Sequence, residues 1–215
     1  MTGHIKIATG IAEITGARSV ILHGSLAAGG FRPGHSDIDL LVVPGHPLRD
    51  DQIQDLVSLV RRESLGEATG LDLHVVTAGI ARSPTRTPPL DLHIGRYVND
   101  FEISERVPAD PDLPTELSMA RAGGRALLGP PPADVIGPVP AGWIVDRGRH
   151  WLRTWQQQTD DLDHLTFMTE TACRIWHFAV TNSHCSKPAA VAWARERNAP
   201  DDLPQLLARV LSEIR

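Results

Sequence analysis

The sequence predicts a small α/β domain followed by a compact bundle of helices, with the boundary between residues 1–108 and 109–215. Short apolar runs of strand character are confined to the first part,. Helical patterns fill the second part,. The proline-rich segment VPADPDLP, residues 107–114, lies between them, and we expect the hinge there,.

Three apolar runs in the first part predict strands, at residues 19–24, 38–43 and 71–77,. Residues 48–64 separate the last two runs, and their apolar positions follow spacings of three, one and three. These spacings form the apolar stripe of an amphipathic helix. The positions in question are Ile53, Leu56, Val57 and Val60. The order strand, loop, strand, helix, strand therefore predicts the α/β domain.

Five helical segments are predicted in the second part. The first, residues 115–129, ends at Gly129 before three prolines, which is typical of a helix terminus,. The others are residues 143–158, 165–180, 187–197 and 203–215. Several short helices in sequence favour a compact all-α bundle.

The composition is that of an ordinary globular protein, with 41% apolar and 22% charged residues in a chain of 215,. We find no run of roughly 18 apolar residues that could span a membrane,. The N-terminus has no basic region followed by an apolar core,. Cys173 and Cys185 show no metal or redox spacing and are expected to be reduced thiols,. We therefore expect a cytoplasmic protein with no membrane partner.

The net charge of -5, from 21 basic and 26 acidic residues, argues against nucleic acid as the main partner. A protein that binds a phosphate backbone normally has a basic face, and no run of residues here provides one,. A cationic small molecule is compatible with this charge.

The segment ILHGSLAAGGFRPGHSDIDLLVV, residues 21–43, contains the strongest chemical signal. Asp37 and Asp39 are separated by one residue, so in a strand both carboxylates point to the same side,. Two adjacent carboxylates repel unless a divalent cation neutralises them, and oxygen ligands of this kind suit Mg²⁺. Upstream, Gly24 and Ser25 follow a strand, where backbone N–H groups and a hydroxyl could hold phosphate oxygens,.

This combination of an apolar strand, Gly-Ser and Asp-x-Asp resembles the motif of the nucleotidyltransferase superfamily related to DNA polymerase β. The resemblance implies a mixed sheet with flanking helices and a third carboxylate on a neighbouring strand. Asp72 in LDLHVV matches that position. The resemblance also implies that Asp37, Asp39 and Asp72 are the catalytic residues and hold two Mg²⁺ ions. Asp72 is in addition implied to be the catalytic base.

The second part resembles the C-terminal domain of the aminoglycoside adenylyltransferases that modify streptomycin and spectinomycin. The matching segments are ARAGGRALLGPPPADVIGPVP, LRTW and residues 173–204. The resemblance implies ATP-binding roles for Gly24, Ser25, Ser36, Asp37, Asp112 and Lys187. It also implies that the nucleotide lies between the two domains.

For the acceptor, Trp155 and Asp160 resemble a tryptophan and an aspartate that contact streptomycin in this family. An indole face and a carboxylate suit a guanidinium group. The alternative for Trp155 is a place in the core, because Trp151 lies one helical turn before it,.

The sequence thus predicts a monomeric enzyme that uses ATP and Mg²⁺ to adenylylate a hydroxyl of a cationic aminoglycoside antibiotic, giving resistance. Two alternatives stay open: a protein-adenylylating enzyme of toxin–antitoxin type, or a catalytically idle nucleotide- or drug-binding module. Two departures from the family bear on them. Asp72 stands where the resistance enzymes carry glutamate, and the family's C-terminal tyrosine has no equivalent, since Tyr97 is the one tyrosine.

Overall fold

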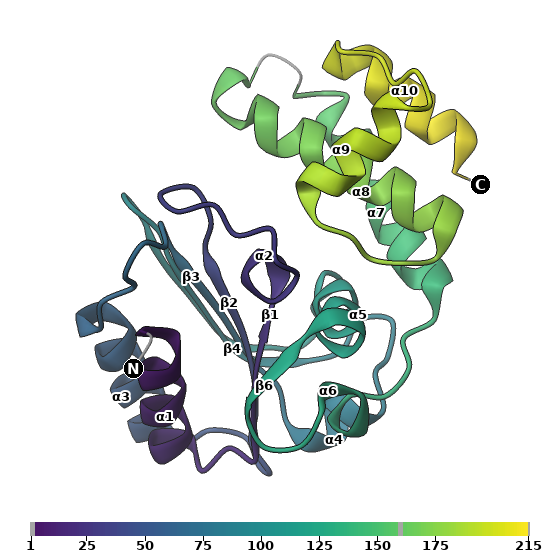
Figure 1. Cartoon of the computed structure of the whole chain (residues 1–215). Helices are drawn as coiled ribbons and strands as arrows, with labels where there is room; N and C mark the ends of the chain where they lie inside the picture. Colours follow the sequence, from purple (N-terminus) through teal and green to yellow (C-terminus); the bar gives the residue numbers. More distant parts are fainter. Residues whose placement is uncertain (1–2, 159–160, 215) are drawn as a thin grey trace. The chain divides into compact units, whose positions relative to one another are not determined.

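The computed structural model describes residues 3–158 and 161–214, which form two compact units. The first unit comprises Met1–Val139 and the second Pro140–Arg215 (Figure 1). The α/β domain and the helical domain predicted from the sequence are both present. The division lies at 139/140, whereas the sequence placed it at 108/109.

The first unit is built on a six-stranded mixed sheet with strand order β5-β4-β3-β2-β1-β6 (Figure 1). Only the β2–β3 pair is parallel among these strands. The strands are β1 (Ser19–His23), β2 (Ile38–Val43), β3 (Leu71–Val75), β4 (Leu90–Arg96), β5 (Phe101–Val107) and β6 (Arg125–Leu128). The helices are α1 (Gly3–Thr15), α2 (Gly24–Ala27), α3 (Asp50–Arg62), α4 (Ala78–Arg82), α5 (Leu113–Gly123) and α6 (Pro132–Val135).

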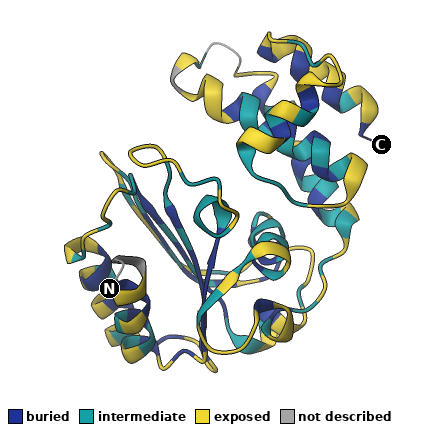
Figure 2. Cartoon of the chain, viewed as in Figure 1, coloured by how far each residue is buried: buried dark blue, intermediate teal, exposed yellow. Residues whose placement is uncertain are grey.

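One face of this sheet packs against α1 and α3. Alternate strand residues such as Leu40, Leu73 and Leu92 form a core with Ile7 of α1 and Leu56 of α3. The inward side of both helices is buried and their outward side is exposed (Figure 2). This is the apolar stripe that the 48–64 periodicity predicted.

The opposite face divides into an apolar part and a polar part. Leu41 and Val43 of β2 pack there against Leu117 of α5 and Ala81 of α4. Because side chains alternate along a strand, Asp39 lies on this same face, at the start of β2,. The apolar core thus gives way to polar side chains at one end of the strands.

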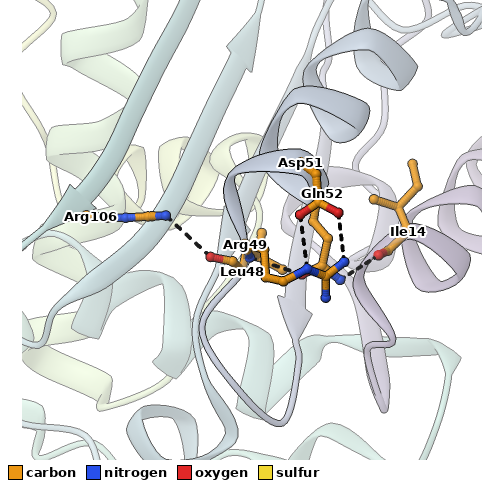
Figure 3. Close-up of polar contacts among 6 residues, drawn as sticks. All are labelled: Ile14, Leu48, Arg49, Asp51, Gln52 and Arg106. Carbon is orange, nitrogen blue, oxygen red and sulfur yellow. Dashed lines mark hydrogen bonds and ion pairs between the residues drawn. The ribbon is translucent and has the colours of Figure 1, made fainter.

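The start of α3 is held by polar contacts to two other parts of the unit (Figure 3). The Gln52 side chain accepts from the Arg49 backbone N–H at 3.0 Å and donates to the Ile14 carbonyl at 2.8 Å. Arg106 donates to the Leu48 carbonyl at 3.5 Å. These contacts join the helix start to the end of α1 and to β5.

Residues 125–128 differ from the prediction of one helix over 115–129. The helix α5 ends at Gly123, and β6 pairs antiparallel with β1. This pairing places α5, β6 and α6 in the first unit, which is why the division lies beyond residue 108. The β4–β5 hairpin and α1 were not predicted either.

The second unit consists of α7 (Ala141–Trp155), a short 3-10 helix η1 (Leu162–His164), α8 (Leu165–Thr181), α9 (Lys187–Arg195) and α10 (Leu203–Glu213). The four longer helices match the predicted segments. Their apolar sides meet in one core around Trp176, which is 1% exposed. In the described part of the chain, no helix is both long and apolar enough to cross a membrane.

Candidate active site

Four residues form a row across the polar part of the sheet. His23 on β1 pairs in register with Asp39 on β2. Asp39 pairs with Asp72 on β3, and Asp72 pairs with Gly95 on β4. Residues in register on neighbouring strands point to the same face, so the predicted carboxylates Asp39 and Asp72 are brought side by side.

Gly24 approaches Asp39 so closely that no other residue fits. A Cβ atom added to Gly24 would lie 1.8 Å from Asp39 Oδ2, and the backbone has φ +63°. Both the space and the left-handed conformation therefore require glycine. Ser25, the next predicted residue, belongs to α2, and its carbonyl accepts from the Gly30 N–H at 2.9 Å.

Asp37 and Ser36 lie in the loop immediately before β2. The Asp37 Oδ1 atom accepts a hydrogen bond from the Thr69 hydroxyl at 2.8 Å. Ser36 Oγ accepts from the Arg32 backbone N–H at 3.0 Å and thereby stabilises the turn that precedes Asp37. The loop from α2 to β2 thus brings the Gly-Ser and Asp-x-Asp parts of the motif to one end of the sheet.

Asp72 lies close to three polar side chains of the site. Its Oδ1 atom lies 2.8 Å from His93 Nε2 and 3.4 Å from His74 Nδ1. The Tyr97 hydroxyl donates to its Oδ2 atom at 3.5 Å. Gly95 leaves room for the Tyr97 ring, because a Cβ there would lie 2.8 Å from that ring.

These contacts set the charges around Asp72. Burial raises the pKa of Asp72, but the His93 hydrogen bond and the nearby histidine charges outweigh it and hold the pKa below its usual value,. Burial lowers the pKa of His74. For His93, burial acts in the same direction, yet the hydrogen bond and charge of Asp72 raise its pKa above the usual value. Asp72 is therefore held as a carboxylate.

His23 is a buried histidine at the edge of the same row. It is 1% exposed, and neither of its ring nitrogens has a hydrogen-bond partner. Burial lowers its pKa to about 3, so the ring is neutral at pH 7. Its Nδ1 atom lies 3.7 Å from Glu116 Oε2 on α5.

The carboxylates fit Mg²⁺ by their chemistry and placement. Asp39 and Asp72 lie next to each other on strands about 4.8 Å apart. Two carboxylates at this spacing repel each other, and a bound cation would relieve the repulsion. The Asp39 carboxylate packs directly against the Gly24 backbone, so the glycine turn of the motif and the carboxylate pair lie in contact. Magnesium is commonly held in this way, by one or two carboxylates and substrate phosphates.

Asp112 lies in the first unit, where it immediately precedes α5. Its backbone N–H donates to Asp110 Oδ1 at 2.8 Å. The charges of Asp110 and Asp112 act on His74 and oppose the lowering of its pKa. Asp112 is thus electrostatically coupled to the polar row, although the sequence had placed it in the helical domain.

The other predicted residues belong to the second unit. Lys187 begins α9, with its Nζ atom 3.9 Å from Glu170 Oε2 and 4.6 Å from the centre of the Phe167 ring. Trp155 is 6% exposed and stacks on Trp151, so its indole packs in the core as the alternative interpretation expected. Asp160 lies outside the described residues.

The histidines and Tyr97 are the residues that sequence reasoning missed. A signal was available, because the tetrapeptide Leu-Asp-Leu-His occurs twice, at residues 71–74 and 90–93. Alternation places the Asp and His of each copy on one face of its strand. The antiparallel pairing of β3 with β4 then sets His74 opposite His93, with ring centres 4.7 Å apart.

Comparison with known proteins identifies the family of this chain. The family described as "Nucleotidyltransferase domain" matches residues 5–89, which include Gly24 and all three carboxylates. The aminoglycoside (3'') (9) adenylyltransferases of Klebsiella pneumoniae and Escherichia coli are each 31% identical to this chain. Each alignment covers 94% of this chain and 83% of the relative.

The fold is also shared with a solved structure. The spectinomycin adenyltransferase of Enterococcus faecialis, crystallised with ATP and spectinomycin, superposes with a TM-score of 0.68 at 17% identity. The match covers 99% of this chain and 87% of the other. By its sequence along almost its whole length, this chain belongs to the aminoglycoside (3'') (9) adenylyltransferase family of nucleotidyltransferases.

Proposed function

We propose that this enzyme transfers the adenylyl group of ATP to a hydroxyl of a cationic aminoglycoside or aminocyclitol antibiotic such as streptomycin or spectinomycin. The observation that carries the proposal is the pairing of Asp39 with Asp72 beneath Gly24. This arrangement brings a pair of carboxylates into contact with the glycine turn that begins α2. The product would be the adenylylated drug, and its formation would give resistance in the cytoplasm, where ATP is available.

Asp37, Asp39 and Asp72 would hold two Mg²⁺ ions together with the triphosphate. When bound, the ions would neutralise the phosphate charge that grows during transfer. Ser25, Ser36 and the backbone at Gly24 would position the triphosphate, while Asp112 and Lys187 would contact the nucleotide from the start of α5 and of α9. The roles of these residues follow the family resemblance.

We assign general-base catalysis to Asp72. The His93 contact to its Oδ1 atom is 2.8 Å, whereas the Tyr97 contact to its Oδ2 atom is longer, at 3.5 Å, so the acceptor proton would pass to Oδ2. The acceptor oxygen then forms a bond to the α-phosphorus, and the bond from that phosphorus to the β-phosphate oxygen breaks. Pyrophosphate leaves and AMP remains on the drug.

For the acceptor, a charged drug would be attracted by carboxylates, with Asp160 as the candidate contact. Trp155 would act indirectly. Its carbonyl accepts from the Gln158 N–H at 3.0 Å, at the start of the segment that leads to Asp160. The core packing of Trp155 thus supports that segment rather than offering an indole face to the drug.

The test is to incubate the full chain with ATP, Mg²⁺ and a panel of aminoglycosides, and to look for AMP-modified drug by mass spectrometry. We expect AMP to be added to at least one streptomycin- or spectinomycin-like drug, together with release of pyrophosphate. Asp39→Asn serves as the matched inactive protein. If no drug in the panel gains AMP while the protein binds ATP, the proposed acceptor class is wrong.

A further inference from the structure

We infer that Asp72, His74 and His93 form a binding site for a transition-metal ion of the zinc type, and that this site fills without nucleotide. Among the described residues, these three are the one group whose carboxylate and imidazole ligand atoms all lie within 4.8 Å of one another. The family resemblance accounts for Asp72 but not for the two histidines. Metal binding here does not depend on the proposed function, although one consequence given below does.

The types of ligand atom in this cluster indicate which metal ions would bind. Two imidazoles and one carboxylate suit Zn²⁺, Co²⁺ or Ni²⁺, whereas Mg²⁺ prefers oxygen atoms alone. A set of two histidines and one carboxylate also leaves a fourth position open, as in zinc sites that bind water or a substrate. The Asp37–Asp39 side of the row offers only oxygen and stays suited to magnesium.

Two of the three distances between ligand atoms are close to those that such a metal needs, and all three are within 4.8 Å. In a tetrahedral zinc site with bonds of about 2.0–2.1 Å, neighbouring ligand atoms lie roughly 3.3 Å apart. His74 Nδ1 is already 3.4 Å from Asp72 Oδ1. His93 Nε2 is 2.8 Å from the same oxygen, so this contact would lengthen slightly when the metal replaces the shared proton.

The strands hold these ligands in place before any ion arrives. His74 and His93 face each other in register on β3 and β4, and their rings stack with an interplanar angle of 30°. His74 Nδ1 is buried without a hydrogen-bond partner, and a metal bond would satisfy it. The negative charges of Asp110 and Asp112 act on His74 and favour a cation there.

The probe is Co²⁺, added to the full chain without nucleotide and followed by its visible absorption. We expect an intense band typical of four-coordinate Co²⁺, saturating at one ion per chain and removed by Zn²⁺. His93→Gln keeps a donor for Asp72 but loses the imidazole ligand. His74→Asn removes the other imidazole and keeps a polar side chain there. Losing even an outer-shell partner costs about 10–100-fold in affinity, so each variant should bind at least roughly a hundredfold more weakly.

The matched control is His46→Asn, an exposed histidine of the first unit outside the cluster. It should bind Co²⁺ like the parent. Circular dichroism of all variants tests that the fold is intact. If folded His74→Asn and His93→Gln bind Co²⁺ as the parent does, or if the parent gives no such band, the inference is overturned.

One consequence rests on the proposed function: Zn²⁺ should inhibit adenylyl transfer in the presence of excess Mg²⁺, because it occupies the base Asp72. The two ideas fail separately. Co²⁺ binding without drug adenylylation would contradict the proposed function alone. Drug adenylylation without Co²⁺ binding would contradict the metal site alone.

Discussion

Asp39 and Asp72 occupy the same register position on the parallel strands β2 and β3, so two carboxylates stand side by side on one face of the sheet. Like charges directly opposite in a sheet are destabilising, by an amount on the order of 0.2–1 kcal/mol. A local cost in stability of this kind is typical of functional sites.

The first prediction is that Asp39→Asn separates stability from activity. Without divalent ions, the variant should match the parent's stability to within about 1 kcal/mol, because the change removes one of two adjacent like charges. It should also lose the stabilisation that ATP and Mg²⁺ give to the parent, along with nearly all transfer. Thermal unfolding with and without ATP and Mg²⁺ measures both effects. A variant that keeps more than a third of the parent's activity would remove Asp39 from the site.

The second prediction concerns Gly24. Its replacement by alanine would put a methyl group 1.8 Å from Asp39 Oδ2 and force either the carboxylate or α2 to move. We expect Gly24→Ala to lower kcat/KM by more than roughly a hundredfold, which is about 2.7 kcal/mol of transition-state stabilisation.

Gly29→Ala is the matched control for Gly24→Ala. Gly29 has a similar φ of +73° and lies in the same connection, but a Cβ there meets nothing within 4 Å. The Gly29→Ala variant therefore introduces backbone strain on the order of 1–2 kcal/mol without a steric clash of the new methyl group. Equal losses of activity in the two variants would show that strain alone matters.

The third prediction tests Asp72 as the base. If Asp72 only held metal, raising the Mg²⁺ concentration should restore much of the activity of Asp72→Asn. We expect the loss to persist at saturating Mg²⁺, because the amide cannot take the acceptor proton. Initial rates over a Mg²⁺ titration provide the measurement. Full recovery would leave Asp72 as a ligand and remove the base role.

The fourth prediction follows from the burial of Trp155. Its indole stacks on Trp151 and meets the Phe167 ring edge-on, so Trp155→Ala should destabilise the second unit by about 3–5 kcal/mol,. Urea unfolding measures this change. Leu162→Ala, at a side chain that is 76% exposed, should change stability by no more than about 0.5 kcal/mol,.

The same Trp155 variant also tests the acceptor. A core role predicts equal losses for streptomycin and spectinomycin, since damage to the fold does not depend on the drug. A loss confined to streptomycin would instead indicate direct contact with its guanidinium groups.

The fifth prediction is a pH dependence of stability that arises at His184. Burial lowers its pKa to about 4 in the folded protein, from 6.5. Between these values the unfolded chain binds a proton at this residue that the folded protein does not. The contribution is therefore fully present above pH 6.5 and is lost as the pH falls from 6.5 toward 4.

His184→Phe keeps an aromatic ring against Phe178 and removes the titrating group. Its free energy of unfolding should fall less between pH 7 and 5 than that of the parent. His150→Phe, at an exposed residue of α7, is the matched control for the substitution itself. Identical slopes in the parent and His184→Phe would show that His184 does not contribute.

The local patterns of this sequence were enough to predict much of the fold. Strands β1, β2 and β3 and helix α3 follow from apolar alternation and from the 3.6-residue periodicity, which depend on neighbouring residues alone. The same holds for the four longer helices of the second unit. Asp37, Asp39 and Asp72 could be proposed from the motif, because two of them are two residues apart and the third starts the next predicted strand.

The remaining parts of the fold and of the site depend on contacts between segments that are distant in sequence. Residues 125–128 have a helical composition, yet they form β6 because the edge of β1 offers hydrogen bonds that local propensity does not reveal,. The sequence around Trp155 fits a ligand-binding residue and a core residue equally well. Only the packing of the helices of the second unit places its ring in the core. The grouping of two histidines with Asp72 also depends on the tertiary structure. His74 and His93 are 19 residues apart in sequence and meet only because β3 and β4 pair in the register that sets them face to face beside Asp72.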